Sequence, residues 1–295
     1  MSAPRRVPPL VRLARAARVV HPFPSVLDGV VVAAVALVGG GAPDLAARLG
    51  VSMTLLQFAI GALNDVVDAP TDAGLKPGKP IPAGFVPHRL AAAVALTSAV
   101  AGVGLALAAG PLLGALAIVV LGIGASYDLR AKGTPLSWLP LAVGIPILPV
   151  YGWLGATGSL PSVFGVLVPL AAVAGAALAI ANALVDLERD RAAGVGSVAV
   201  ALGPGRAARI VLLLHAIVGI AALVVAGAVG APAGWLAAIA LAATVPAGGA
   251  GIGIAASGRP ATGLRDRAWE GQAVGTALLA VAWLGAVSAA GAMGR

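Results

Sequence analysis

Long apolar segments, each close to the length that crosses a bilayer, dominate this chain and restrict the folds open to it. Polar or turn-rich breaks divide it into about nine such segments, at residues 25–41, 45–66, 88–109, 111–127, 138–157, 163–185, 207–229, 232–256 and 268–291. Hydrophobic residues make up 60% of the sequence and charged residues 10%, with a mean hydropathy of +1.01. Since one crossing takes about 20 apolar residues, the sequence predicts an all-α, polytopic membrane protein with about nine transmembrane helices.

Small residues and a basic N-terminus add to this prediction. Many segments are rich in Ala, Gly, Val and Leu, and the chain holds 41 Gly, so its helices can pack closely. We expect residues 1–295 to form one transmembrane domain, a single bundle without a soluble domain. Residues 1–21 carry Arg5, Arg6, Arg12, Arg15 and Arg18. Because no small-residue cleavage site follows them, we interpret this segment as a cytoplasmic amphipathic lead-in.

The distribution of Lys and Arg predicts the orientation in the membrane. All of the 19 basic residues except Arg48 and Arg295 fall at one end of the predicted bundle, in the N-terminal arm and near residues 65–89, 128–136, 186–209 and 257–267. The positive-inside rule places this end in the cytoplasm and the C-terminus outside, in a cell inner membrane. The net charge of +8 is therefore a topology signal, and nucleic acid is not a predicted partner, because acids share these loops.

The side chains that could bind a metal ion are few in type. The chain has no Cys, which excludes disulfides, thiolate ligands and a cysteine nucleophile, and it has three His. Carboxylates must therefore supply most of any metal chemistry.

Asn and Asp recur in one spacing at two places where an apolar segment meets a polar loop. The first motif is Asn64, Asp68 and Asp72, and the second is Asn182, Asp186 and Asp190, each residue lying 118 positions after its counterpart. This repetition favours two related halves. Residues four apart share a helix face, so each motif gathers oxygen ligands. We expect Pro70 to end the first helix and leave Asp72 in a loop, whereas the second motif stays on one helix face.

Crowded carboxylates next to hydrocarbon repel one another, and a divalent ion relieves this repulsion. Hard oxygen ligands, waters and a phosphate are the surroundings that Mg²⁺ prefers. Basic residues suited to phosphate oxygens lie nearby: Lys76 and Lys79 after the first motif, Arg189 and Arg191 within the second, and Arg130 and Lys132 in a third loop with Tyr127 and Asp128. The alternatives are helix caps with solvated loop charges and, for the third loop, an ordinary positive-inside loop.

At these residues the chain resembles the UbiA superfamily of intramembrane prenyltransferases, and the resemblance covers nearly the whole sequence. Asn64-Asp65-x-x-Asp68-x-x-x-Asp72 is similar to the first Asp-rich motif of that family, and Lys79-Pro80-Ile81-Pro82-Ala83-Gly84 resembles its basic-Pro-Ile-Pro-x-Gly tail. The segment from Asp186 to Arg191, with Gly194 and Leu202-Gly203 beyond it, resembles the second motif. The segment from Tyr127 to Lys132 is similar to the loop between the motifs.

The resemblance implies nine transmembrane helices around a central cavity that opens to lipid, with Mg²⁺ and diphosphate under cytoplasmic loops. The implied reaction moves an isoprenyl group from a prenyl diphosphate to a lipophilic or aromatic acceptor in the membrane. The expected metal ligands are Asn64, Asp68, Asp72, Asn182, Asp186 and Asp190, and the expected catalytic residues are Asp65, Asp68, Asp72, Asp186, Asp190 and Lys132. The expected substrate-binding residues are Lys76, Lys79, Tyr127, Asp128, Arg130, Arg191 and Asp28.

Asp28 and two departures from the family pattern concern the acceptor. Asp28 lies inside the first apolar segment, where a carboxylate usually faces a cavity, so it either orients the acceptor or lies at the interface. Ala183 and Val185 stand where many relatives have polar and basic residues, which leaves the acceptor open. Aromatic residues make up only 4% of the chain, and we expect most of the Trp side chains to anchor at the membrane interface.

Other functions share some of these features. A UbiA-type terpene cyclase ionises the same kind of substrate and quenches the cation internally. An ion-coupled transporter also uses membrane acids, but its sites are expected near the midplane rather than at one face. A CDP-alcohol phosphotransferase would need Gly directly after the second Asp of its motif, and Asp68 is followed by Ala69.

Overall fold

The computed structural model describes residues 8–255 and 263–294, and within them the regular structure is helical. The long helices are α2 (Pro22–Val38), α3 (Pro43–Leu75), α4 (His88–Ala109), α5 (Pro111–Ser126), α8 (Phe164–Val185), α11 (Pro204–Ala228), α12 (Ala233–Ala255) and α13 (Leu264–Ala289). In the described residues, eight helical stretches are long and apolar enough to cross a membrane, or nine if one bent pair counts as a span. This confirms the predicted all-α membrane fold.

The bent pair is the first predicted span with the segment before it. Residues Pro9–Val20 and Pro22–Val38 meet at an angle of 59°. The first part contains α1 (Pro9–Ala17) and the short η1 (Arg18–Val20), and the bend falls at His21, whose φ is 48°. Leu10 and Leu13 of α1 are exposed beside Arg12. The amphipathic lead-in role of this segment stays a prediction.

The fifth predicted span, residues 138–157, consists of two helices. These are α6 (Leu139–Gly144) and α7 (Ile147–Thr157), and Pro146 is the N-cap residue of the second. Because proline has no backbone N–H and restricts the residue before it, it interrupts the helix at this point. The same span nevertheless crosses the bundle.

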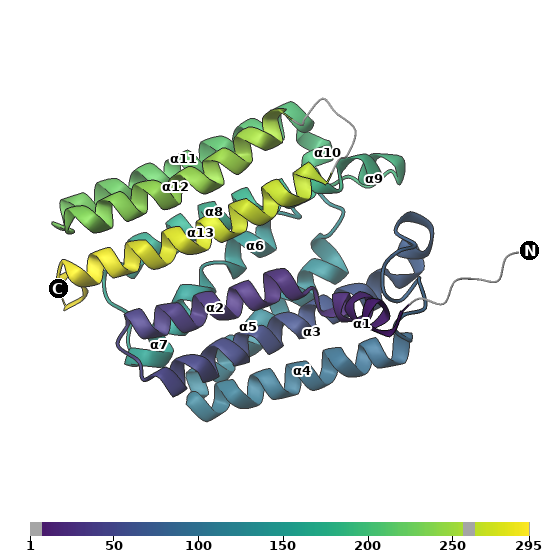
Figure 1. Cartoon of the computed structure of the whole chain (residues 1–295), viewed down its shortest axis with the longest axis horizontal. Coiled ribbons are helices and arrows are strands. Elements are labelled where there is room, and N and C mark those ends of the chain that lie inside the picture. The colour runs from purple at the N-terminus through teal and green to yellow at the C-terminus, as the bar shows by residue number, and fades with distance from the viewer. Residues whose placement is uncertain (1–7, 256–262, 295) are drawn as a thin grey trace, which may run out of the picture.

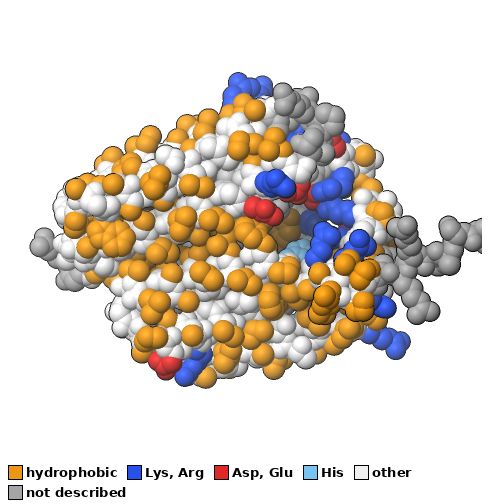
Figure 2. Space-filling view, in the orientation of Figure 1, with side chains coloured by type: hydrophobic (Ala, Val, Ile, Leu, Met, Phe, Trp, Pro, Cys, Tyr) orange, Lys and Arg blue, Asp and Glu red, His pale blue; other side chains and the backbone are white. Residues whose placement is uncertain are grey.

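The long helices lie side by side along one direction (Figure 1). Helices α2, α3 and α4 pack in sequence on one side, and α11, α12 and α13 on the other, with α8 against α11. The short helices α1, α9 (Leu187–Ala192) and α10 (Val198–Leu202) lie at one end, and α13 finishes at the other. Lys and Arg side chains gather at the first of these ends on the face that Figure 2 shows. The charge asymmetry read from the sequence is therefore present in the fold.

Glycines let the helices approach one another at the centre of this bundle. A Cβ added to Gly29 of α2 would lie 2.6 Å from the carbonyl oxygen of Gly50 in α3, and one added to Gly152 of α7 would lie 2.6 Å from that of Val32. A Cβ on Gly175 of α8 would lie 2.4 Å from the Leu141 carbonyl oxygen of α6. Only glycine fits at these crossings, which is how small residues support helix packing in a membrane.

Candidate active site

The first Asn/Asp motif lies entirely on α3. The helix continues through Pro70 to Leu75, so the prediction that Asp72 lies in a loop is wrong. Pro70 removes one backbone donor, but the helix resumes its hydrogen bonds beyond it, as the bond of 2.8 Å from the Lys76 amide to the Asp72 carbonyl shows. Asn64, Asp65 and Asp72 are buried. The face they share turns toward the interior of the bundle.

The second motif is divided between two helices. Asn182 is on α8, which ends at Val185, Asp186 lies in the bend, and Asp190 is on α9. The prediction of one continuous helix face is wrong here. Leu187, just after the bend, is completely buried in the cluster that contains Val198 and Ala199 of α10. The change of direction accompanies this burial and turns Asp186 toward the first motif.

Lys79 joins the three carboxylates of the first motif. Its Nζ lies 2.7 Å from Asp65 Oδ1, 3.0 Å from Asp72 Oδ2 and 3.8 Å from Asp68 Oδ2. The Lys79 side chain is 19% exposed. Lys79 belongs to the segment that follows α3, where turns such as the bond of 3.0 Å from its amide to the Lys76 carbonyl bring the chain back over the helix. One cation thus lies within 4 Å of all three acids.

Contacts from other elements bring the two motifs and the third loop together. Lys76 Nζ lies 2.8 Å from Asp186 Oδ2 and connects the first motif to the second. In the π-helix η2 (Tyr127–Ala131), Asp128 accepts a hydrogen bond of 2.6 Å from Asn64. Lys132, directly after it, pairs with Asp68. The convergence expected from the sequence is present at one end of the bundle.

Other predicted residues stand apart from this network. Asn182 is exposed on α8, whereas its counterpart Asn64 is buried and hydrogen-bonded. Arg130 and Arg191 are exposed, at the same end as the acids. The side chain of Asp190 is half-buried on α9. These four residues stay predictions, and the two halves of the site differ in their surroundings.

The donor chemistry fits a hard cation, although in the described residues no three His, Asp or Glu side chains are arranged around one metal position. Basic side chains lie between the carboxylates instead. Lys79 lies within the first motif, and Lys76 and Arg189 pair with Asp186. Asp128 Oδ2 is buried without a hydrogen-bond partner in the described residues, and Asp72 Oδ2 is buried 3.0 Å from the Lys79 ammonium. Such oxygens have capacity for an oxygen-binding ion.

The two lysines of the segment after α3 have opposite pKa shifts. Burial alone would lower the pKa of Lys79, but the hydrogen bonds and charges of Asp65 and Asp72 outweigh it, so its pKa is raised. Burial lowers the pKa of Lys76, and the nearby charges of Arg189 and Lys79 add to this shift. As the pH rises, Lys76 therefore loses its proton before Lys79 does.

This order predicts the alkaline limit of activity. If the Lys76 ammonium contacts the diphosphate, activity falls as the pH rises through its lowered pKa. We expect Lys76→Arg, which keeps its charge at any such pH, to move the alkaline limb of the rate profile upward, and Lys76→Gln to lower the rate at every pH. Rates measured across neutral to alkaline pH with a saturating metal concentration test this, and an unchanged limb in Lys76→Arg contradicts it.

Two contacts of the site were not expected from the sequence. His21 Nε2 lies 3.1 Å from Asp65 Oδ1, and the Gly61 position on α3 leaves room for the Val20 backbone and the His21 Cβ. Arg265 of α13 contacts both carboxylate oxygens of Glu188 at 2.7 Å and so ties α9 to α13. A basic residue after an unassigned loop gave no indication of this pair.

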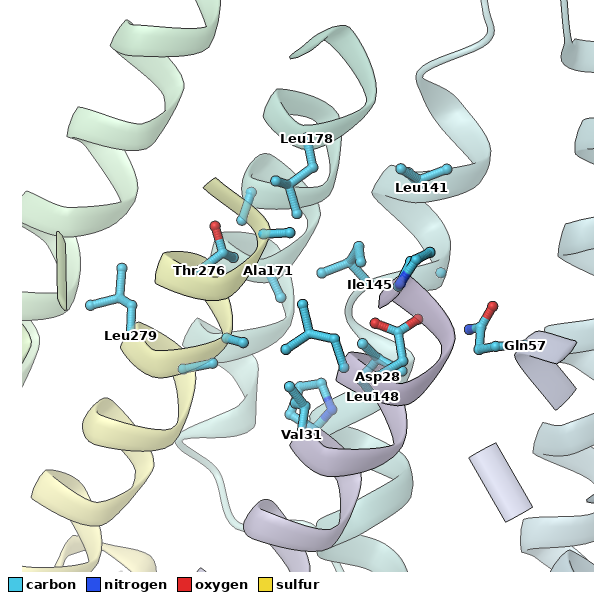
Figure 3. A pocket seen from close by; sticks show the side chains of 18 of the residues that line it. Asp28, Val31, Gln57, Leu141, Ile145, Leu148, Ala171, Leu178, Thr276 and Leu279 are labelled. Atoms are coloured by element: carbon cyan, nitrogen blue, oxygen red, sulfur yellow. The ribbon is translucent and has the colours of Figure 1, made fainter. Parts of the chain in front are cut away.

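An apolar cavity of about 280 Å³ lies inside the bundle and reaches Tyr127 of the third loop (Figure 3). Its walls come from α2, α3, α5, α6, α7, α8, α11 and α13. Trp269 and Trp283 line it. Trp283 and Trp153 are buried, with exposed fractions of 2% and 5%, so the prediction of an interfacial position is wrong for these two. The volume is at the lower end of that for small-molecule sites.

The fold and this site define a helical membrane protein in which charged carboxylates and lysines cover one end of an apolar cavity. Residues 28–262 match the model of the UbiA prenyltransferase family. The chain belongs to this family, as its motifs indicated.

Known proteins show the same relationship. The chain is 34% identical over 178 residues to the digeranylgeranylglyceryl phosphate synthase of Methanopyrus kandleri; the match covers 59% of this chain and 64% of that relative, slightly under two thirds. A UbiA homologue of Aeropyrum pernix K1 superposes with a TM-score of 0.69 at 20% identity, over 90% of this chain and 97% of that one. A homologue from Archaeoglobus fulgidus, bound to GPP and Mg²⁺, gives 0.66 at 18%, over 90% and 99%. These two likenesses concern the fold.

Proposed function

We propose that this protein transfers an isoprenyl group from a prenyl diphosphate to an acceptor held in the membrane cavity, with Mg²⁺ as cofactor. The observation that carries the proposal is the convergence of both Asp motifs and three lysines above the apolar cavity. The diphosphate needs cations and metal-bound oxygens, and the prenyl chain needs an apolar wall. This site offers both next to one another. Relatives bound to GPP or DMAPP together with Mg²⁺ support the proposal.

The acids and bases have separate roles in this proposal. Asp68, Asp72, Asp186 and Asp190 would hold Mg²⁺ with Asn64 and Asn182, and Asp65 would position Lys79. The ion supplies charge neutralisation for the departing diphosphate. Lys76, Lys79 and Lys132 would bind phosphate oxygens, with Arg130 and Arg191 at the rim. Cations fixed at this position stabilise the transition state more than the ground state, because negative charge grows on the diphosphate as the carbon–oxygen bond breaks.

The orientation belongs to the same proposal. The end that carries the acids, the lysines and the short helices would face the cytoplasm. There the charged diphosphate of the substrate would stay in water while its prenyl chain enters the membrane. The positive-inside rule supports this placement, since Arg48 at the opposite end is one of the few basic residues away from it.

Purified protein with geranylgeranyl diphosphate tests the function. We expect release of inorganic diphosphate that requires Mg²⁺ and is abolished by EDTA. A prenylated acceptor in a lipid extract identifies a transferase, and a cyclic hydrocarbon in its place identifies a cyclase. Diphosphate release that does not depend on Mg²⁺ contradicts the proposal, and so does a complete absence of diphosphate release.

A further inference from the structure

Four polar side chains lie in the cavity at positions that the diphosphate chemistry does not use. Asp28 comes from α2, Gln57 from α3, and Trp269 and Thr276 from α13. The rest of the described lining is apolar apart from Tyr127 near the third loop and Trp283, whose Nε1 donates to the Ala222 carbonyl, and Asp28 is the one charged residue in it. A prenyl chain consists of hydrocarbon and needs none of these groups. They therefore indicate a second, polar ligand.

Three of these four side chains, all but Gln57, have unused hydrogen-bonding capacity in the described residues. Trp269 Nε1 and Thr276 Oγ1 are buried without a hydrogen-bond partner among the described residues. Asp28 likewise has no hydrogen bond or ion pair to the described part of the chain. A buried polar atom left without a partner costs about 1–3 kcal/mol, and an intramembrane carboxylate usually marks a functional position. A ligand with polar atoms of its own would supply partners for these groups.

The helices place these groups around one space. Trp269 and Thr276 are seven residues apart, two turns along the same face of α13, and α13 packs against α2. In Figure 3 the amide of Gln57 is turned toward the Asp28 carboxylate, and Thr276 lies on the wall formed by α13. Asp28 is six residues into α2, about 9 Å along its axis from Pro22. This polar group is therefore deeper in the membrane than the start of the helix.

Charge decides which ligand fits. An anionic head group would face the Asp28 carboxylate in a cavity whose described lining holds no Lys, Arg or His. An uncharged hydroxyl fits, because it can donate to Asp28 and accept from Trp269 Nε1 or Thr276. Like-charge contact in a low dielectric is costly, so the same geometry excludes an anion.

We propose that Asp28 binds the hydroxyl group of an uncharged lipid alcohol, the acceptor of the transferase, and takes the proton of this hydroxyl, while Trp269 and Thr276 on α13 donate to other polar atoms of the same acceptor. This inference rests on the proposed function. The allylic carbon–oxygen bond breaks and its electron pair leaves with the diphosphate. The acceptor oxygen bonds to the allylic carbon while its O–H bond breaks, and the proton moves to the Asp28 carboxylate. The products are a prenyl ether, diphosphate and a protonated Asp28, which water later deprotonates.

A matched pair of acceptors, one neutral and one anionic, tests whether the site excludes an anionic acceptor. The probes are 1-O-geranylgeranylglycerol and its 3-phosphate, each offered with geranylgeranyl diphosphate and Mg²⁺ in detergent. We expect the neutral ether to be used with a kcat/KM at least about tenfold higher than the phosphate, the size of one lost or repelled polar contact in a buried site. Equal use, preference for the phosphate or no transfer to the neutral ether overturns the proposal.

Variants then separate acceptor binding from diphosphate chemistry. Asp28→Asn should lower transfer to the neutral ether about 100-fold, the lower end for loss of a general base, while Mg²⁺-dependent diphosphate release without acceptor stays within about twofold of wild type. Thr276→Val should raise the KM for the ether with little change in kcat. Thr97→Val, the same substitution at an exposed position of α4 outside the cavity lining, serves as the control.

The readouts keep the two hypotheses apart. If wild-type protein releases no diphosphate, the proposed function fails. If wild-type protein releases it and Asp28→Asn transfers the isoprenyl group as well as wild type does, only the role of Asp28 fails. Equal losses of diphosphate release and transfer in Asp28→Asn would also overturn this role, because they would place Asp28 in the ionisation step.

Discussion

Asp68→Asn is expected to lower kcat/KM for prenyl transfer by about 100- to 1,000-fold, the loss typical of removing one group that stabilises transition-state charge. The substitution keeps the shape of the side chain and removes its negative charge. Asp68 is the acid that links two lysines, since its Oδ2 pairs with Lys132 and lies 3.8 Å from Lys79 Nζ. In the proposed site, loss of this charge would remove a metal ligand and the carboxylate that pairs with Lys132.

Asp44→Asn is the matched control for this variant. Asp44 is on the same helix, α3, but at its opposite end, where it is exposed. We expect wild-type rates there. Thermal unfolding of both variants in the same detergent checks that each is folded. A folded Asp68→Asn protein with more than about a tenth of wild-type activity would remove Asp68 from the proposed site.

The transmembrane architecture could be predicted from the sequence because hydropathy and length determine it. The third predicted span, residues 88–109, has the same bounds as α4. Prediction was less accurate where proline and buried side chains compete with the local pattern. Pro70 leaves α3 intact because the bonds after it re-form, whereas α8 ends at Val185 with no proline near, as Leu187 packs into the interior. Local sequence rules do not contain these tertiary contacts.

The sequence indicated that acids and lysines would meet at one end of the bundle, but it did not indicate their pairing, and the roles of the site residues stay predictions. The Asn-x3-Asp-x3-Asp spacing indicated which acids would gather, and the lysines of the following loops were expected to face phosphate. The structure places Lys79 between Asp65, Asp68 and Asp72, and adds His21 to Asp65. Such contacts cannot be read from local sequence patterns because the partners are far apart in the chain. His21 and Asp65 are 44 residues apart, and Lys76 and Asp186 are 110 residues apart.

The cavity was implied by the family resemblance and its lining was not. Residues from eight helices form it, and their positions depend on glycine crossings such as Gly29 against Gly50. A single sequence shows that Gly is frequent, but it does not show which two helices meet at each Gly. That depends on how the helices pack. For the same reason Trp153 and Trp283 are in the interior rather than at the interface.

The position of Lys79 predicts that metal and lysine substitute for one another as counter-ions. We expect Lys79→Gln to destabilise the protein by at most about 3 kcal/mol in EDTA, because it leaves Asp65 and Asp72 buried without their cation and Lys79 itself is 19% exposed. In saturating Mg²⁺ the loss should shrink, since the bound ion neutralises the same carboxylates and stabilises the folded state that binds it.

Chemical unfolding of wild-type and Lys79→Gln protein, each in EDTA and in Mg²⁺, measures the four stabilities that this prediction needs. Arg89→Gln is the control, because Arg89 is exposed at the same end of the bundle, near the start of α4. It should change stability little and equally in both conditions. An identical loss for Lys79→Gln with and without Mg²⁺ would mean that the ion binds away from the carboxylates around Lys79. A smaller loss in Mg²⁺ places it among them by a measurement independent of turnover.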